Sequence, residues 1–322
     1  MERYECLGKI GEGAAGVVHR ARDRATGETV AVKRLRGGVG CGGEEEWLRE
    51  ARCLEACRGH PHLVELRAAH LERGTGYVVM EYVDGPSLAR VVRREGRGPP
   101  SFAEGEVRRL MRQLLDGVAA MHAAGVVHRD LKPDNVVVGP RGDLKICDFG
   151  MSRVVAPADA PPYTSPVVTL WYRAPELILG SREYDARVDT WALGCIMAEL
   201  LAGAPLFPGR SEMDQLNRVF DTVGMQDMRS WPGFARLPRA ESALCHRARP
   251  PSRLREMFPA LSAAGFDVLS GLLACRPDRR LAAADALRCP WFTDADADAV
   301  PAACGGARFT TCVSGVADAI VV

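Results

Sequence analysis

The stretch VVHRDLKPDNVVV, residues 126–138, sets three polar side chains of different chemistry between two apolar runs. They are Asp130, Lys132 and Asn135, and the segment ICDFG at residues 146–150 adds a second carboxylate, Asp148. Mg²⁺ takes oxygen ligands such as carboxylate and amide groups, and a carboxylate near a hydroxyl group can accept its proton. The set therefore predicts magnesium-assisted phosphoryl transfer; the alternative is three unrelated polar residues in loops.

A glycine-rich loop precedes this set, because residues 11–18 read GEGAAGVV and fit the pattern G-x-G-x-x-G-x-V. An alternating strand, a turn and another strand follow it, whereas a dinucleotide-binding glycine motif opens a helix. A glycine loop between antiparallel strands can fold over a triphosphate, since its backbone N–H groups face the oxygens with no Cβ in the way. On its own the loop also fits an ordinary hairpin.

Two further charges belong with the loop. Lys33 lies inside the apolar strand VAVKRL and needs an anionic partner unless its stem reaches solvent. If residues 44–57 form a helix, Glu50 shares a face with Trp47, Ala51 and Leu54. A carboxylate on an apolar face calls for a cation, so we expect Lys33 to bind Glu50, phosphate oxygens or both. Taken singly, each is more often a solvent-facing charge.

Composition limits the class of protein. The chain has 322 residues, a formal charge of +1 and 11 cysteines without C-x-x-C pairs. We expect reduced thiols and an intracellular location, with nucleus or cytoplasm left open. The start of the chain, MERYECLGKI, lacks an apolar signal region. We expect neither a signal peptide nor a membrane span, and no nucleic-acid partner.

Element patterns divide the chain into two parts. Residues 4–83 are mostly strand-like with one helix, and helical periodicity dominates from Ser101 onward. Ser101 and Glu104 fit a capping box at a helix start, and residues 136–147 fit a hairpin. RVDTWALGCIMAELLAG, from Arg187, predicts a buried helix. The expected fold class is α+β, with a small β-rich lobe and a larger, mostly helical lobe.

The order of the motifs resembles that of eukaryotic protein kinases. It runs GEGAAGVV, AVK ending at Lys33, HRDLKPDN, DFG, APE at residues 174–176 and DTWALG from Asp189. VVTLWYRAPELILGSREYD, LFPGRSEMDQL and ALRCPWF resemble cyclin-dependent kinases in particular. The resemblance covers residues 4–292 and implies a two-lobed kinase domain, with an N-lobe at 4–83, a C-lobe at 84–292 and ATP in the cleft. Residues 293–322 would be a loosely ordered extension.

Carried over by position, the resemblance implies a role for each motif residue. Lys33 would hold the α- and β-phosphates and pair with Glu50, and Asp130 would be the catalytic base. Lys132 would steady the γ-phosphate, and Asn135 and Asp148 would ligate Mg²⁺. The other ATP contacts it implies are Ile10, Gly11, Glu12, Gly13, Ala14, Ala15, Gly16, Val17 and Val18 of the loop, with Ala31, Glu81, Val83 and Val137 around the adenine and Met80 behind it.

The resemblance also implies regulation and substrate preference. Thr164 aligns with an activating phosphosite, and a phosphate there would add charge that needs cations. Three arginines match the family's phosphate-binding set: Arg49, Arg129 and Arg153. Val167 and Val168 match a pocket for proline, which implies Ser/Thr-Pro protein substrates. Ala14 and Ala15 stand where many of these kinases carry Thr-Tyr, so inhibitory phosphorylation is not expected.

The chain departs from the family at its first helix. Cyclin-binding members carry P-S-T-A-I-R-E there, whereas GGEEEWLRE keeps only the final Arg-Glu. Docking of an ordinary cyclin is therefore doubtful, and a divergent regulatory subunit or no partner stays open. Two other functions remain. One is a catalytically weak, pseudokinase-like scaffold, although no catalytic residue is missing. The other is a kinase of other kinases' activation loops or of the RNA polymerase II tail.

Overall fold

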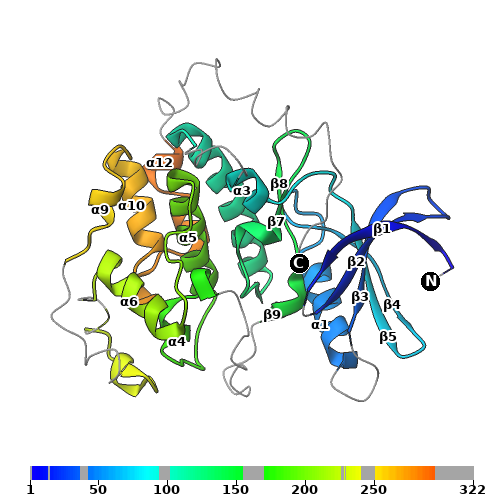
Figure 1. Cartoon of the computed structure of the whole chain (residues 1–322), viewed down its shortest axis with the longest axis horizontal. Coiled ribbons are helices and arrows are strands. Elements are labelled where there is room, and N and C mark those ends of the chain that lie inside the picture. The colour runs from blue at the N-terminus through cyan, green and yellow to red at the C-terminus, as the bar shows by residue number, and fades with distance from the viewer. Residues whose placement is uncertain are drawn as a thin grey trace.

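The computed structural model describes residues 2–13, 15–36, 43–93, 102–154, 170–225, 228, 230–240 and 251–293. A β-sheet lies at one end of the molecule and a helical lobe at the other (Figure 1). The predicted α+β architecture, a small β-rich lobe with one main helix beside a larger helical lobe, is confirmed. Among the described residues, no helix is long and apolar enough to cross a membrane.

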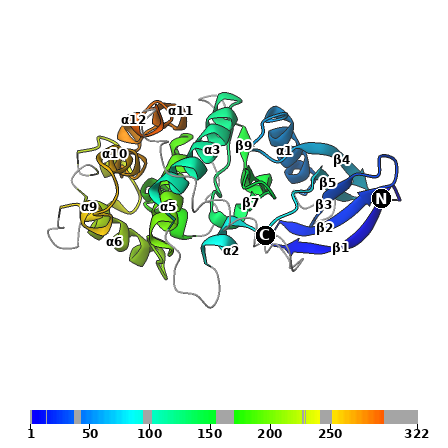
Figure 2. The same ribbon diagram turned by 90° about the horizontal axis from the view of Figure 1, so that it is seen from above.

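The sheet of the small lobe is antiparallel, with strand order β1-β2-β3-β5-β4. Its elements are β1 (Tyr4–Glu12), β2 (Gly16–Asp23), β3 (Thr29–Leu35), β4 (Leu66–Glu72), β5 (Thr75–Glu81) and helix α1 (Gly43–Ala56). Alternation along β3 puts Val30 and Val32 in a small cluster with Val79, so Ala31 and Lys33 face the other way. Helix α1 lies between the sheet and β9 in both views (Figures 1 and 2).

The helical lobe is built around two long helices, α3 and α5, which pack against each other. Its α-helices are α2 (Leu88–Val92), α3 (Glu104–Ala123), α4 (Pro175–Ile178), α5 (Arg187–Ala202), α6 (Glu212–Val223), α9 (Leu254–Met257), α10 (Ala263–Leu272), α11 (Ala283–Ala286) and α12 (Pro290–Thr293). The prediction that α5 is a buried helix is confirmed, since most of its side chains are inaccessible to solvent. Trp191 of α5 stacks on Phe207 at a centroid distance of 6.0 Å.

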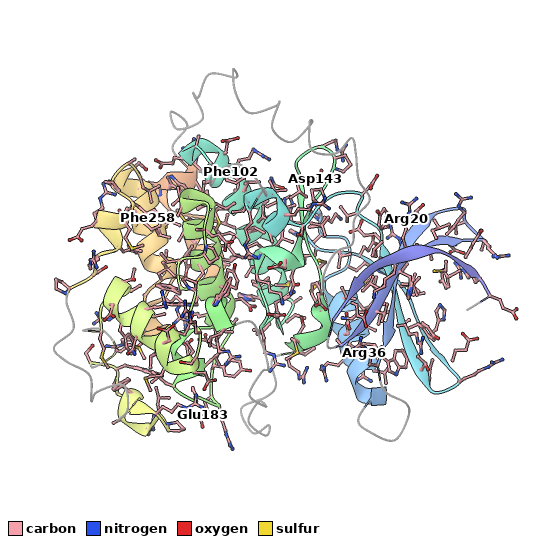
Figure 3. The ribbon with its side chains drawn as sticks, viewed as in Figure 1. Arg20, Arg36, Phe102, Asp143, Glu183 and Phe258 are labelled. Atoms are coloured by element: carbon pink, nitrogen blue, oxygen red, sulfur yellow. The ribbon has the colours of Figure 1, made fainter. Side chains whose placement is uncertain are left out.

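Short elements between α3 and α4 carry the motif residues. They are β6 (Val126–Val127), η1 (Pro133–Asn135), β7 (Val136–Val138), β8 (Leu144–Ile146), η2 (Phe149–Met151) and β9 (Arg153–Val154), with η3 (Leu170–Tyr172), η4 (Phe234–Arg236) and η5 (Pro277–Arg279) further on. The predicted hairpin is confirmed, because β7 pairs with β8. Asp143 lies in its turn, between the sheet and the helical lobe (Figure 3).

The predicted capping box at Ser101 and Glu104 is wrong. Helix α3 begins at Glu104, its N-cap is Ala103, and the Ala103 N–H donates to the Glu106 carboxylate at 3.1 Å. Glu104 instead accepts hydrogen bonds from the Ser262 N–H at 3.0 Å and from the Trp291 indole at 2.8 Å. Ser101 lies outside the described residues. The carboxylate serves a contact between distant segments, which local spacing does not reveal.

Candidate active site

A cavity opens between the sheet and the β7–β8 hairpin. Nine of the residues named from the sequence line it: Ile10, Val18, Ala31, Lys33, Met80, Glu81, Val83, Val137 and Asp148. Four more line it that the sequence reasoning missed: Val64, Tyr82, Lys145 and Cys147. Tyr82 and Cys147 could have been found from their positions beside Glu81 and Asp148. The walls are mostly apolar, with charge at one end, as suits a flat ring joined to an anionic tail.

Lys33 forms the charged end of the cavity. Its Nζ lies 2.9 Å from Glu50 Oε1 and 2.7 Å from Asp148 Oδ1, and the side chain is almost fully buried. Burial acts to lower the pKa of Lys33, but the Asp148 and Glu50 carboxylates outweigh it and raise that pKa. The expected Lys33–Glu50 ion pair is therefore present, and Lys33 carries its charge at neutral pH.

The two carboxylates that bind Lys33 differ in their environment. Burial raises the pKa of Glu50, and its Oε2 has no hydrogen-bond partner among the described residues. Burial also acts to raise the pKa of Asp148, but the charge of Lys33 and its hydrogen bond lower it overall. Asp148 has a left-handed backbone, with φ 59°, which is uncommon for a residue other than glycine. The acceptor best suited to a cation is thus Asp148.

Asp130 lies at the centre of the catalytic loop, residues 128–135. Its Oδ2 accepts from Lys132 Nζ at 3.0 Å and from Asn135 Nδ2 at 3.3 Å, and Asn135 Nδ2 also donates to the Asp130 carbonyl at 2.8 Å. Asp130 Oδ1 is buried and has no partner among the described residues. Burial raises the pKa of Asp130, and Lys132 opposes that rise. The loop presents one free carboxylate oxygen as a proton acceptor.

The carboxylate of Asp189, in α5, fixes the backbone of this loop through hydrogen bonds. Asp189 accepts from the His128 N–H and the Arg129 N–H, both at 2.8 Å, and lies 2.9 Å from His122 Nε2. Arg129 has φ 69°, a strained value that these two bonds help to hold. In the sequence, DTWALG marks a family motif, but nothing in its local pattern indicates a role for Asp189. Only the fold shows that it fixes the backbone beside Asp130.

The glycine-rich loop joins β1 and β2 over the cavity. Glu12 forms ion pairs with Lys9 and Arg36, and the Arg36 N–H donates to the Ala15 carbonyl at 3.2 Å. Gly16 has no room for a side chain, because a Cβ there would lie 2.3 Å from the Arg34 carbonyl oxygen. Six loop residues, Gly11, Glu12, Gly13, Ala15, Gly16 and Val17, do not line the cavity. Ala14 lies outside the described residues.

Three arginines gather beside η2. Arg49 Nη2 donates to the Gly150 carbonyl at 3.0 Å and Arg129 Nε to the Met151 carbonyl at 2.7 Å. Burial, together with the charges of Arg129 and Arg49, lowers the pKa of Arg153 to about 10. Like charges held together in this way favour an anion. Thr164, Val167 and Val168 lie outside the described residues, so their position relative to this cluster is not described.

A second, smaller cavity lies beside Asp130. Asp130, Tyr172, Arg173 and Leu177 are among its lining residues, and Arg173 forms an ion pair with Glu212 at 2.9 Å. Asp148 lines the first cavity and Asp130 the second. The arrangement can hold an anionic tail on one side and a hydroxyl group on the other.

Known protein kinases resemble this chain in sequence. Residues 4–292 match the family described as the protein kinase domain. The chain is 87% identical over 330 residues to a protein named putative cyclin-dependent kinase F-2 of Oryza sativa subsp. japonica, covering all of both chains. It is 40% identical to cyclin-dependent kinase 20 of Homo sapiens, over 94% of this chain and 86% of that protein.

A third relative is much longer than this chain. Cyclin-dependent kinase G-2 of Oryza sativa subsp. indica is 43% identical over 309 residues, which are 91% of this chain and 42% of that protein.

Proposed function

We propose that the cleft of this chain binds Mg²⁺ and ATP. The premise is that the chain belongs to the protein kinase family and is a serine/threonine kinase of the cyclin-dependent type. The γ-phosphate would pass to a Ser or Thr hydroxyl followed by proline in a protein substrate. The observation that carries this proposal is Asp130, whose buried carboxylate has one oxygen without a partner among the described residues and which lines the second cavity.

The nucleotide would lie in the first cavity. Ile10, Val18, Ala31 and Val137 offer apolar surface on both sides of a flat base, and the backbone of Glu81 and Val83 offers hydrogen bonds at its edge. Lys33, held by Glu50, would face the α- and β-phosphates. The ion pair serves as a positioning device, since a lysine restrained by a buried carboxylate loses less freedom when phosphate binds.

The residues present fit a Mg²⁺ ion. Asp148 and Asn135 supply a carboxylate and an amide, and Mg²⁺ is usually bound by one or two such groups plus phosphates and waters. Among the described residues, no three His, Cys, Asp or Glu side chains gather in a group that could hold a metal ion. When bound, the ion would neutralise phosphate charge.

The proton of the substrate hydroxyl would pass to Asp130. Oδ2 is held by Lys132 and Asn135, so Oδ1 is the acceptor. Lys132 also neutralises charge as the γ-phosphate moves. Phosphoryl transfer depends mainly on positioning and charge. Replacing Asp130 or Lys132 should therefore lower turnover while the chain still folds.

We propose that Thr164 is an activating phosphosite and that Arg49, Arg129 and Arg153 bind its phosphate. A phosphate carries about −1.5 to −2 charges and three acceptors, which suits three crowded guanidinium groups. A cyclin or a divergent regulatory subunit is open as a partner. The domain limits, an N-lobe at 4–83, a C-lobe at 84–292 and an extension at 293–322, also stay proposals, as does the intracellular location.

The test is phosphate transfer by the purified full-length chain. We expect it to phosphorylate Ser-Pro and Thr-Pro peptides in a library in preference to Ser-Ala and Thr-Ala, and to stop when Mg²⁺ is chelated. Asp148→Asn should lose transfer while the chain stays folded. A chain that binds ATP but transfers nothing, with Thr164 phosphorylated and with cyclins added, would favour the scaffold and contradict the proposal.

A further inference from the structure

The position of α1 decides whether Glu50 reaches Lys33, and one contact holds α1 against the sheet. Glu50 is almost fully buried and lies 2.9 Å from Lys33 Nζ. Trp47 precedes Glu50 by three residues, so both side chains lie on the same face of the helix. Trp47 is half-buried and packs against the main hydrophobic core.

Trp47 lies directly against Gly76 of β5. A Cβ built at Gly76 would lie 2.6 Å from Trp47 Cγ, 2.7 Å from its Cβ and 2.9 Å from its Cδ1. The indole alone could turn away, but the Trp47 Cβ moves only with the backbone of α1. A side chain at position 76 would therefore displace the helix that carries Glu50.

Shape rather than polarity makes this contact. Trp47 Nε1 is buried and has no hydrogen-bond partner among the described residues. What the indole contributes is apolar area against a strand surface with no side chain of its own. Gly76 pairs in register with Leu71 of β4, so the β4–β5 hairpin is a fixed support.

We propose that Trp47, packed on Gly76, is a positioning residue. It sets the spacing between α1 and the sheet so that the chain forms the Lys33–Glu50 pair without a partner protein. The proposal rests on the proposed function, because it assumes that the pair serves phosphate transfer. It accounts for a first helix that lacks the cyclin-binding sequence and still holds Glu50 in contact with Lys33.

The first experiment is a double-mutant cycle on the full chain, with ATP turnover on a Ser-Pro peptide as the readout. We expect Trp47→Ala to lower kcat/KM for ATP about tenfold, since residues that act through one interaction are coupled. In a Glu50→Gln chain, where the pair is already lost, Trp47→Ala should cost nothing further. An equal loss in both backgrounds overturns the proposal, as does a lower Tm with unchanged kcat/KM.

The second experiment adds a methyl group on the other side of the contact. Gly76→Ala should lower kcat/KM like Trp47→Ala. The double variant should lose less than the product of the two losses, because both changes act through the position of α1. It should not recover, since an alanine at position 47 keeps the Cβ that lies 2.7 Å from the added methyl group. A double variant with both losses multiplied contradicts the proposal.

A matched control exists in the other lobe. A Cβ built at Gly233 would lie 2.9 Å from Trp231 Cε2 and Cζ2, so Gly233→Ala and Trp231→Ala repeat the same chemistry away from α1. Each should lower Tm without changing kcat/KM for ATP, whether it is introduced into the parent chain or into the Glu50→Gln chain.

Hydrogen exchange separates this proposal from the proposed function. If the unmodified chain transfers no phosphate, the proposed function fails, but α1 can still be examined. Faster amide exchange over residues 47–56 in Trp47→Ala than in Trp231→Ala supports the positioning role, and equal exchange overturns it. An unmodified chain whose α1 exchanges freely until a cyclin is added also overturns it.

Discussion

Two buried charge clusters in this protein are built in opposite ways. In the helical lobe, Arg280 binds Glu176 through both guanidinium arms, at 2.7 and 2.8 Å. Its remaining N–H groups donate to the carbonyls of Ala274, Arg187 and Cys275, at 2.9, 3.0 and 3.1 Å. Every donor of the arginine is used, so the cluster has no place for a ligand.

In the cleft cluster, Lys33 and Glu50 are as deeply buried, but the cluster is incomplete. Lys33 is shared between Glu50 and Asp148, while Glu50 Oε2 and Asp130 Oδ1 have no partner among the described residues. A buried acceptor without a partner costs free energy. Charges of the first kind support the fold, whereas the proposed function assigns charges of the second kind to phosphate, Mg²⁺ and a hydroxyl proton.

The largest effect is expected from replacing Asp130, whose Oδ1 is an oxygen of the cleft cluster without a partner among the described residues. Asp130→Asn should lower kcat by about 10²–10⁴-fold, the range for loss of a general base. The free energy of unfolding should not fall, because Oδ1 accepts no hydrogen bond from the described residues. Peptide phosphorylation and urea unfolding measure the two quantities. Turnover close to that of the parent chain would remove Asp130 from the mechanism.

The second largest effect is expected from breaking the Arg280–Glu176 cluster of the helical lobe. Arg280→Met leaves the Glu176 carboxylate buried without its partner, and should lower the free energy of unfolding by about 3–5 kcal/mol. Urea unfolding beside Asp130→Asn gives the contrast. If both variants unfold at the same urea concentration, the two clusters do not differ in the way described.

The pH dependence of stability should separate two carboxylates within the cleft. Burial raises the pKa of Asp130 above its value in the unfolded chain. The contribution of Asp130 to the free energy of unfolding is therefore most favourable in acid and is lost as pH rises through the folded pKa. For Asp148, the effect of Lys33 outweighs burial and lowers the pKa of the carboxyl group. The contribution of Asp148 to the free energy of unfolding is present above the unfolded pKa and is lost as pH falls through the folded pKa.

At pH 7 we therefore expect Asp130→Asn to stabilise the chain and Asp148→Asn to destabilise it, with both differences shrinking toward acid. Urea unfolding from pH 3 to 7 measures them, and a change of the same sign for both variants would contradict the assignment.

For the glycine-rich loop we expect no change in ATP turnover when an inhibitory kinase is added. An inhibitory kinase that modifies hydroxyl groups of the glycine-rich loop has no target at Ala14 or Ala15, so its addition should leave ATP turnover unchanged. Introducing Ala15→Tyr supplies a phenol as the matched control. A loss of turnover in the unmodified chain, mapped to this loop, would show a different route of inhibition.

Much of the active site was predictable because its chemistry lies in short motifs. The alternation that buries Lys33 in β3 and the helical face that carries Glu50 both follow from local periodicity, and together they predicted the ion pair. Val64 and Lys145 were missed because each reaches the cavity from a segment whose pattern suits an ordinary core or surface position. Asp189 was missed because its partners, His128 and Arg129, lie about 60 residues away in the chain.

The sequence by itself determined the two-lobed fold class, the order of the motifs and the residue types that can handle phosphate and a proton. These depend on local periodicity and on short-range spacing. The tertiary structure decided which polar atoms keep a partner. Glu104 serves Ser262 and Trp291 instead of a capping box, every N–H of Arg280 is used, and Trp47 lies where Gly76 leaves room. Such choices depend on distances between segments far apart in the chain, and only packing sets those distances.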